Sequence, residues 1–213
     1  MQPNSRPLII GITGNIGSGK TTVCQILSQK YPVYYADVIA HQVLQEAAII
    51  EMLVGRWGKE IINDNVIDRK AVAKQIFDNE QELKWLNSVI HPRVLVLMQE
   101  IVDKCISDFL CFEVPLLFEA NLQNCFDHIV IIHSSIKLRK ARVVLRDNLN
   151  SEEIDLRLKN QLSHSEMDSQ FHTTIENNGS LQELSIAVNA FLENVPNLER
   201  RNIYLFNSIT LPH

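Results

Sequence analysis

The chain has 213 residues, of which 46% are hydrophobic and 21% charged, and its net charge is −5. This composition is typical of a globular protein, and the length suits one sizeable α/β domain with room for an insertion. The negative charge argues against a broad nucleic-acid-binding surface. No apolar run reaches the about 18 residues that a membrane-spanning helix requires.

The cysteines Cys24, Cys105, Cys111 and Cys125 form no C-x-x-C pair and no metal-ligand spacing. We therefore expect buried, reduced thiols, as in a cytosolic protein. Residues 1–15 do not have the plan of a signal peptide, because their short apolar stretch runs directly into a glycine-rich loop. These features predict a cytoplasmic protein that does not act at a membrane.

Strand-like and helix-like segments alternate along most of the chain. Residues 7–13 are an apolar run that ends at the glycine-rich loop, as a buried parallel strand does. The alternation predicts an α/β fold with a parallel, doubly wound sheet. The predicted strands are 7–13, 32–37, 109–115, 128–133 and 173–177, and the predicted helices are 19–30, 38–47, 136–147, 151–162 and 181–192.

The middle of the chain, from about 50 to 105, is mostly helical, with loops expected near 55–58 and 63–65. We expect a single domain over 1–213, in which this segment is a helical insertion. A short helical lid is expected at about 136–165, and no role is assigned to the tail 195–213.

The segment GITGNIGSGKTT contains the pattern G-x-x-x-x-G-K-[ST] at Gly14, Gly19, Lys20 and Thr21. Glycines let successive N–H groups turn inward around phosphate oxygens, and the following helix adds its positive N-terminus. Lys20 is expected to bridge the β- and γ-phosphates, while the Thr21 hydroxyl helps to hold Mg²⁺. The expected ATP contacts in this loop are Asn15, Ile16, Gly17, Ser18, Gly19, Lys20, Thr21 and Thr22.

Other classes that use this loop lack support in the rest of the chain. A signalling GTPase should carry N-K-x-D, which does not occur. A transport ATPase or helicase should have an apolar strand ending in Asp or Asp–Glu, whereas the candidate strands here end at Glu113 and His133. A small kinase remains, with acceptor site, lid and loop in one domain.

Such a kinase needs a group that orients or deprotonates the acceptor hydroxyl. Asp37 is expected at the end of the second strand, where ligands of open α/β sheets bind. From its position alone, an N-cap of the following helix is an equal alternative.

Positive charge is also needed over the transferred phosphate. Arg139, Arg142 and Arg146 have the spacing of one helical face, and Arg157 follows. A run of charges is usually a solvated face, but arginine at all of these positions suits bidentate phosphate binding.

Together these segments closely resemble the dephospho-coenzyme A kinase family, from about residue 9 to 184. The loop is similar to the family's G-L-T-G-G-I-G-S-G-K-S-T-V, and Asp37 matches the second Asp of D-A-D-x-I-A-H-x-V. The other segments that carry the resemblance are WGKEII, IDRKAVAKQIF, LNSVIHPRV, EVPLLFE, RVVLRD, RLKNQL and IENNGS.

The resemblance implies a P-loop kinase fold of three layers and transfer of the γ-phosphate of ATP to the ribose 3′-hydroxyl of dephospho-CoA, with Mg²⁺ as cofactor. It implies catalytic roles for Asp37, Lys20 and Arg146. Further ATP contacts are implied at Arg142, Arg146, Asn177 and Gly179. The helical insertion becomes the acceptor-binding part, and the implied acceptor contacts are Asp37, His91, Pro115, Leu116, Phe118, Glu119 and Arg157.

Four positions depart from the family pattern. Asn15 replaces the usual second glycine, and asparagine enters left-handed backbone conformations more easily than most residues. Tyr35 stands where the family often has the first Asp of D-A-D, Met167 where a lysine is common and His172 where Asp is usual.

The resemblance thus implies dephospho-CoA kinase activity, and we expect a monomer or weak homo-oligomer. One alternative is a kinase for another nucleoside or nucleotide. The other is a non-catalytic regulator that binds a nucleotide or CoA, although Lys20, Thr21 and Asp37 are all present.

Overall fold

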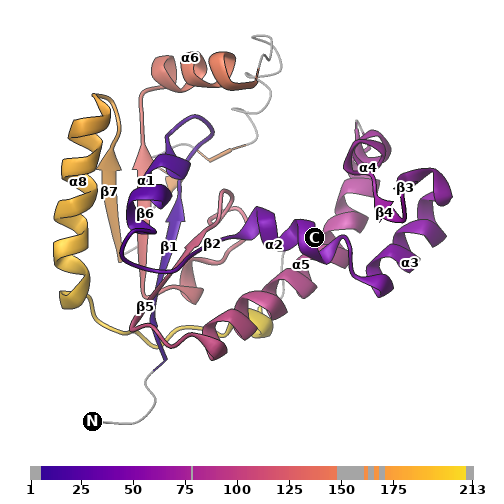
Figure 1. The fold of residues 1–213 in the computed structure, drawn as a ribbon, viewed down its shortest axis with the longest axis horizontal. Coiled ribbons are helices and arrows are strands. Elements are labelled where there is room, and N and C mark those ends of the chain that lie inside the picture. Colours follow the sequence, from indigo (N-terminus) through magenta and orange to yellow (C-terminus); the bar gives the residue numbers. More distant parts are fainter. Residues whose placement is uncertain (1–5, 78, 148–160, 163–165, 168–170, 210–213) are drawn as a thin grey trace. The chain divides into compact units, whose positions relative to one another are not determined.

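The computed structural model of the protein divides into two compact units (Figure 1). The first unit comprises Met1–Tyr35 and Val102–Leu205, and the second comprises Ala36–Ile101 and Phe206–His213. The structure describes residues 6–77, 79–147, 161–162, 166–167 and 171–209.

A five-stranded parallel sheet forms the centre of the first unit, with strand order β2-β5-β1-β6-β7 (Figure 1). The central strand β1 is buried at all six of its residues, as its continuous apolar sequence predicts. The parallel α/β sheet expected from the sequence is therefore confirmed. The strands are β1 (Leu8–Thr13), β2 (Val33–Tyr35), β5 (Phe109–Glu113), β6 (His128–His133) and β7 (His172–Glu176).

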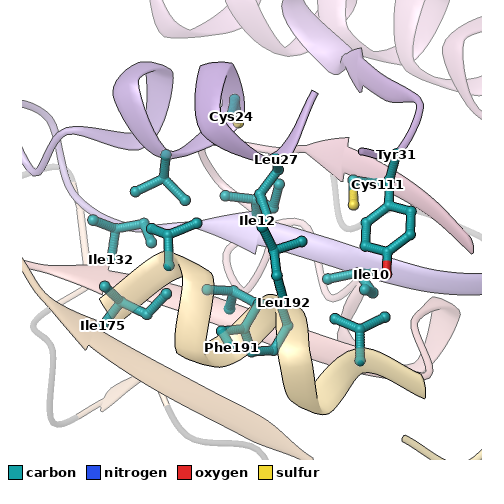
Figure 2. Close-up of a cluster of buried hydrophobic side chains, with 14 of the residues drawn as sticks. Ile10, Ile12, Cys24, Leu27, Tyr31, Cys111, Ile132, Ile175, Phe191 and Leu192 are labelled. Atoms are coloured by element: carbon teal, nitrogen blue, oxygen red, sulfur yellow. The ribbon is translucent and has the colours of Figure 1, made fainter. Parts of the chain in front are cut away.

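One face of this sheet packs against helices α1 (Lys20–Leu27) and α8 (Leu181–Asn194). Figure 2 shows the cluster, in which Ile12 of the sheet lies near Leu27 of α1 and Phe191 of α8. Burying such side chains contributes about 1.5–3 kcal/mol each, so this core holds α1 against the sheet through Val23, Cys24 and Leu27. Among the described residues of the first unit, the other helices with assigned bounds are α6 (Ile136–Asp147), η2 (Gln123–Cys125) and η4 (Val195–Asn197).

The second unit is mainly helical. Its two-stranded hairpin turns at Asp64 and Asn65, which both have positive φ, as the tight turn of a two-residue hairpin requires. No single helix among the described residues could cross a membrane, although the bent pair α2 and α3 together has sufficient length and apolar composition. The elements are α2 (Ala36–Val43), α3 (Ala47–Trp57), η1 (Lys59–Ile61), β3 (Ile62–Asn63), β4 (Val66–Ile67), α4 (Arg69–Ile76), α5 (Glu80–Lys104) and η5 (Phe206–Ser208); α5 continues into the first unit.

Several predicted boundaries are wrong. The second strand ends at Tyr35, and Asp37 lies in the first turn of α2 rather than at a strand end or an N-cap. The predicted loop near 55–58 starts too early in the chain, because Gly55 still belongs to α3, which ends at Trp57. Nothing lies within 4 Å of a Cβ placed at Gly55, so this glycine marks no close approach and only weakens the helix by about 1 kcal/mol. The loop expected near 63–65 is confirmed by the hairpin turn.

All the cysteines are free thiols, and three of them are buried. Burial raises the pKa of both Cys111 and Cys125 to about 12. It also raises the pKa of Cys24, to which the nearby Glu113 carboxylate contributes. These side chains therefore remain protonated at neutral pH, as expected for cysteines that fill a core.

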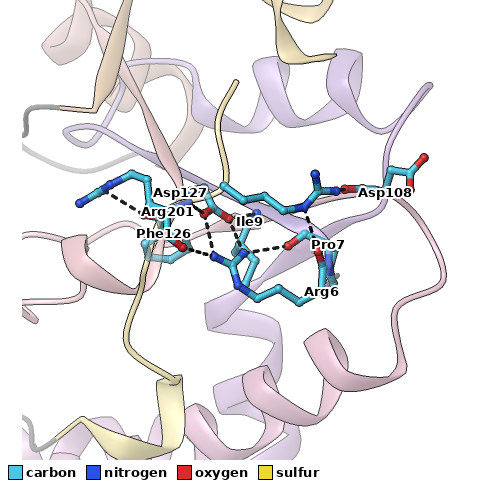
Figure 3. A network of polar contacts seen from close by, with 8 residues as sticks. Arg6, Pro7, Ile9, Asp108, Phe126, Asp127 and Arg201 are labelled. Carbon is cyan, nitrogen blue, oxygen red and sulfur yellow. Dashed lines mark hydrogen bonds and ion pairs between the residues drawn. The ribbon is translucent and has the colours of Figure 1, made fainter. Parts of the chain in front are cut away.

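The tail segment that precedes Phe206 joins the amino-terminal strand through Asp127 (Figure 3). The fully buried Asp127 carboxylate accepts hydrogen bonds from the Arg6 guanidinium at 2.6 and 2.8 Å. It also accepts from the backbone N–H groups of Ile9 at 2.8 Å and Arg201 at 2.6 Å. One side chain thus connects both ends of the first unit to the loop before β6, which gives this part of the tail a structural role.

Candidate active site

The glycine-rich loop connects β1 to α1 in the geometry that a phosphate loop requires. Gly14, Gly17 and Gly19 have φ values of 141°, 76° and 100°, which side-chain-bearing residues rarely adopt. A Cβ on Gly17 would lie 2.6 Å from the backbone oxygen of Arg139. The glycines therefore satisfy both the backbone turn and the close approach of neighbouring segments.

Lys20 is the first residue of α1, and its side chain folds back over the loop. Its ammonium donates to the carbonyl oxygen of Gly14 at 2.7 Å and to that of Asn15 at 3.4 Å. This places a positive charge at the mouth of the loop, where the β- and γ-phosphates are expected. Thr21, the predicted Mg²⁺ contact, is the exposed second residue of α1, and Thr22 follows it.

Asn177, just after β7, connects three parts of the site. Its side-chain amide donates to the carbonyl oxygen of Ser18 at 2.7 Å. Its backbone oxygen accepts from the hydroxyl of Ser134 at 2.8 Å and from the guanidinium of Arg142 at 3.0 Å. The amide predicted to contact ATP is thus bonded to the phosphate loop. Gly179 is exposed and precedes the capping box of Ser180 that begins α8.

The predicted arginine stripe is present on α6, and its members differ in environment. Arg142 donates to Ser134 Oγ at 3.1 Å and to the carbonyl oxygen of Gly17 at 3.4 Å, so it lies beside the loop. Arg139 donates to the Ser134 carbonyl oxygen, and burial lowers its pKa. Arg146 is exposed at the end of α6. Arg157 and most of the predicted helix 151–162 lie outside the described residues.

Asn15 adopts no left-handed backbone, contrary to the expectation from its sequence. Positive φ among the described non-glycine residues occurs only at Asp64, Asn65 and Asn121. Asn15 is instead only 6% exposed, and its side-chain amide donates to the carbonyl oxygen of Leu162 at 2.8 Å. A hydrogen bond, and not a special backbone angle, is what this asparagine supplies.

The residues expected to line the acceptor wall follow β5. The Pro115 carbonyl oxygen accepts from the hydroxyl of Thr13 at 3.3 Å, which ties the start of this loop to β1. Leu116 is exposed, whereas Phe118 is buried. One carboxylate oxygen of Glu119 accepts from the backbone N–H of Leu162 at 3.0 Å, and the other is buried with no hydrogen-bond partner among the described residues.

The other two predicted acceptor residues lie in the second unit. Asp37 is exposed in the first turn of α2, where its charge favourably faces the positive helix N-terminus. His91 lies within α5, directly before Pro92. Burial lowers the pKa of His91, so its imidazole is neutral at pH 7.

Sequence patterns do not identify two residues that the structure places beside the loop. Glu113 ends β5 and pairs in register with Ile12, so its buried carboxylate lies at the loop end of the sheet. The signal was an apolar strand that ends in an acid. The other is Gln161, whose side-chain oxygen accepts from the Ile16 N–H at 2.8 Å. No local sequence pattern predicts that contact, because Ile16 and Gln161 are far apart in the sequence.

The structure shows the environments of two residues that depart from the family pattern, Met167 and Tyr35. Met167 is 3% exposed, which suits an apolar side chain where the pattern has lysine. Tyr35 ends β2 and pairs with Glu113. Burial raises the pKa of its hydroxyl, and the nearby Cys24 and Glu113 add to the shift.

The family model described as dephospho-CoA kinase matches residues 8–183. That match includes the loop, β5 with its following wall, α6 and β7. The chain belongs to the dephospho-CoA kinase family. The resemblance seen in the sequence is thereby confirmed.

Individual relatives agree with this membership. A dephospho-CoA kinase of Fusobacterium nucleatum is 35% identical over 190 residues, which cover 88% of this chain and 98% of the relative. The crystal structure of TT1252 from Thermus thermophilus is similar with a TM-score of 0.76 and 33% identity, covering 90% of this chain and 99% of that one. A dephospho-CoA kinase from Campylobacter jejuni has a TM-score of 0.67 and 25% identity, covering 89% of this chain and 97% of the other.

Proposed function

We infer that this protein is a dephospho-CoA kinase, which transfers the γ-phosphate of ATP to the ribose 3′-hydroxyl of dephospho-CoA and releases CoA and ADP. The observation that carries this inference is the family match over residues 8–183, nearly the whole chain. The phosphate loop within that match has its glycines in the required left-handed conformations and Lys20 over its mouth. The reaction is the last step of coenzyme A biosynthesis.

On the nucleotide side, the loop residues 14–22 and Lys20 hold the phosphates of ATP. Arg142 lies beside the loop, where it suits contact with the nucleotide, and Arg146 one turn later supplies charge for the transferred phosphoryl group. In this proposal, Asn177 and Gly179 contact the adenine of ATP. Most of the rate enhancement is expected from positioning and charge stabilisation.

The site also suits Mg²⁺, the cofactor that we propose. Hard oxygen ligands favour this ion, and the hydroxyl of Thr21 and the carboxylate of Glu113 lie at the loop end of the sheet. The described residues contain no cluster of three or more His, Cys, Asp or Glu side chains that could hold a metal. That finding fits magnesium in kinases, which binds through one or two protein oxygens together with substrate phosphates. When bound, Mg²⁺ neutralises phosphate charge.

On the acceptor side, Asp37 orients the ribose 3′-hydroxyl and accepts its proton. The hydroxyl oxygen then forms a bond to the γ-phosphorus, while the bond from that phosphorus to the β–γ bridging oxygen breaks. His91, as a neutral imidazole, can donate or accept a hydrogen bond to the acceptor. The remaining acceptor contacts in this proposal are Pro115, Leu116, Phe118, Glu119 and Arg157.

We further propose a single kinase domain over 1–213, with the acceptor-binding insertion at about 50–105 and a lid at about 136–165. The enzyme would work in the cytoplasm as a monomer or weak homo-oligomer, without a nucleic-acid or membrane partner. The net charge of −5 and the buried, protonated cysteines support this setting.

An acceptor comparison tests the function. The purified chain is given ATP with dephospho-CoA, adenosine, AMP or shikimate, and ADP release is followed in a coupled assay. Dephospho-CoA is expected to give by far the highest kcat/KM. Preference for another acceptor would assign the chain to a different kinase, while tight binding of ATP and dephospho-CoA without ADP release would identify a non-catalytic regulator.

A further inference from the structure

The Asn15–Ile16 peptide of the phosphate loop is held from both sides. Its N–H, on Ile16, donates to the side-chain oxygen of Gln161 at 2.8 Å. Its carbonyl oxygen, on Asn15, accepts from the backbone N–H of Ser18 at 3.1 Å and from the Lys20 ammonium at 3.4 Å. Because a trans peptide is planar with N–H and C=O pointing oppositely, these bonds fix the orientation of the whole unit.

Leu162, the residue after Gln161, is also held from both sides of its backbone. The Leu162 carbonyl oxygen accepts from the Asn15 side-chain amide at 2.8 Å, and the Leu162 N–H donates to Glu119 at 3.0 Å. Three side chains thus bind the pair 161–162 to the loop and to the segment after β5. The Gln161 bond to the peptide and the Asn15 bond to Leu162 therefore belong to one attachment between residues 15–16 and 161–162.

We propose that Asn15 and Gln161 are positioning residues for ATP, which together hold the phosphate loop in its binding conformation before the nucleotide arrives. This inference rests on the proposed use of ATP at the loop. A glycine, the usual residue at position 15 of the family pattern, has no side-chain donor for the Leu162 carbonyl oxygen. The 6% exposure of Asn15 shows that its amide is committed to this contact and not to solvent.

The physical basis is the mobility of the loop itself. Gly14 and Gly17 permit many backbone conformations, of which only a few direct the N–H groups toward phosphate. The apparent dissociation constant of a ligand rises when the competent conformation is only fractionally populated. The two amides therefore act on ATP affinity, and the phosphoryl-transfer step, which follows binding, is nearly independent of them.

The test compares Asn15→Ala, Gln161→Met and the double variant with the unchanged chain. Binding of a non-hydrolysable ATP analogue is measured by calorimetry without acceptor, and kcat and both KM values are then measured with dephospho-CoA. Losing one such hydrogen bond is expected to weaken analogue binding by ~10-fold, while kcat and the acceptor KM change by less than about twofold. Asn189→Ala, which removes an exposed amide on α8, is the matched control and should change nothing.

The double variant should bind the analogue about as weakly as either single variant, because the two contacts share one attachment. Asn15→Asp provides a test without loss of volume. Its ionised carboxylate would repel the Leu162 carbonyl oxygen, whereas its protonated form can donate to it, so affinity relative to the unchanged chain should recover as pH falls.

Analogue affinity within about twofold of the unchanged chain for both single variants would overturn the proposal. So would equal losses in affinity, kcat and acceptor KM, which would indicate general disruption of the fold. The proposed function fails separately, because a chain that binds the analogue through this clamp and yet transfers no phosphate to dephospho-CoA would contradict only that function.

Discussion

The side-chain amide of Asn177 donates a 2.7 Å hydrogen bond to the backbone oxygen of Ser18, 159 positions earlier in the chain. This contact joins the end of β7 to the phosphate loop directly before Gly19. The backbone oxygen of Asn177 simultaneously accepts from Arg142 on α6. These hydrogen bonds join the phosphate loop, the end of β7 and α6 into one connected polar network.

Gly19→Ala is expected to abolish efficient ATP use. A Cβ at Gly19 would collide with the Asn177 side-chain nitrogen, and the φ of 100° disfavours any side chain. ATP affinity measured by calorimetry should fall together with turnover, by at least ~100-fold in kcat/KM, since electrostatic positioning in such sites carries effects of this size. Gly55→Ala is the control, because that glycine is helical and has open space around it, and it should be neutral or slightly stabilising.

Lys20→Ala should lower turnover by at least ~100-fold, because the variant lacks the charge that stabilises the transferring phosphoryl group. The measurement is steady-state ADP release with saturating dephospho-CoA. Lys137→Ala removes an exposed lysine from α6 and should leave the rate unchanged. A Lys20→Ala enzyme with near-normal kcat would exclude this lysine from phosphoryl transfer.

Asp37→Asn should also lower turnover by at least ~100-fold, since the amide cannot accept the proton of the acceptor hydroxyl. ATP binding, measured by calorimetry, should stay largely intact, which distinguishes this variant from Lys20→Ala and Gly19→Ala. Asp64→Asn changes an exposed turn residue in the same unit and serves as control, because asparagine accepts its φ of 50° equally well. Near-normal turnover of Asp37→Asn would remove this aspartate from the mechanism.

Asp127→Ala should destabilise the first unit by about 3 kcal/mol, because the fully buried carboxylate is the acceptor of two backbone N–H groups and of Arg6, whose side chain is only 28% exposed. The N–H groups of Ile9 and Arg201 would lose their acceptor, and Arg6 would lose its carboxylate partner while keeping the carbonyl oxygens of Pro7 and Arg201 (Figure 3). Urea unfolding measures the change in free energy. Glu80→Ala, which breaks an exposed i,i+4 pair with Lys84, should cost less than about 1 kcal/mol. Similar costs for the two variants would contradict the importance of the Asp127 network.

Stability should fall as the pH is lowered from 7 to 5. Burial, with smaller contributions from His172 and Arg201, lowers the pKa of His128 in the folded chain. Below the unfolded-state pKa of about 6.5, the unfolded chain then binds more protons than the folded chain, and acid favours unfolding. His128→Phe retains stacking on Phe191 and should flatten this dependence, as measured by urea unfolding at several pH values.

In His128→Phe, the change of the unfolding free energy with pH should be reduced and not removed. Burial also lowers the pKa of His91 and His41, so these residues still contribute to it. The variant should also be less stable at pH 7, because the Thr173 hydroxyl loses its 2.8 Å partner on His128. A slope identical to that of the unchanged chain would show that His128 does not titrate differently in the folded and unfolded states.

Local sequence patterns predict those parts of this fold that local interactions determine. The apolar run of β1 predicts a buried strand, and the bounds of β6 and α6 are those expected from periodicity. Boundaries fail where the local signal is ambiguous. Asp37 suits both an N-cap and a first helical turn, and Gly55 in α3 is a weak helix former that the surrounding helix tolerates.

The sequence by itself determined the phosphate loop, the parallel sheet and the family, because glycine spacing and apolar periodicity are properties of neighbouring residues. Only the tertiary structure decided what Asn15, Gln161 and Asn177 do. Each of these amides bonds to a backbone group 145 or more positions away in the chain. A side-chain amide carries both an acceptor oxygen and a donor NH2 group, so it can bond to many kinds of partner. Which partner it takes is decided by the surrounding fold and not by its neighbours in sequence.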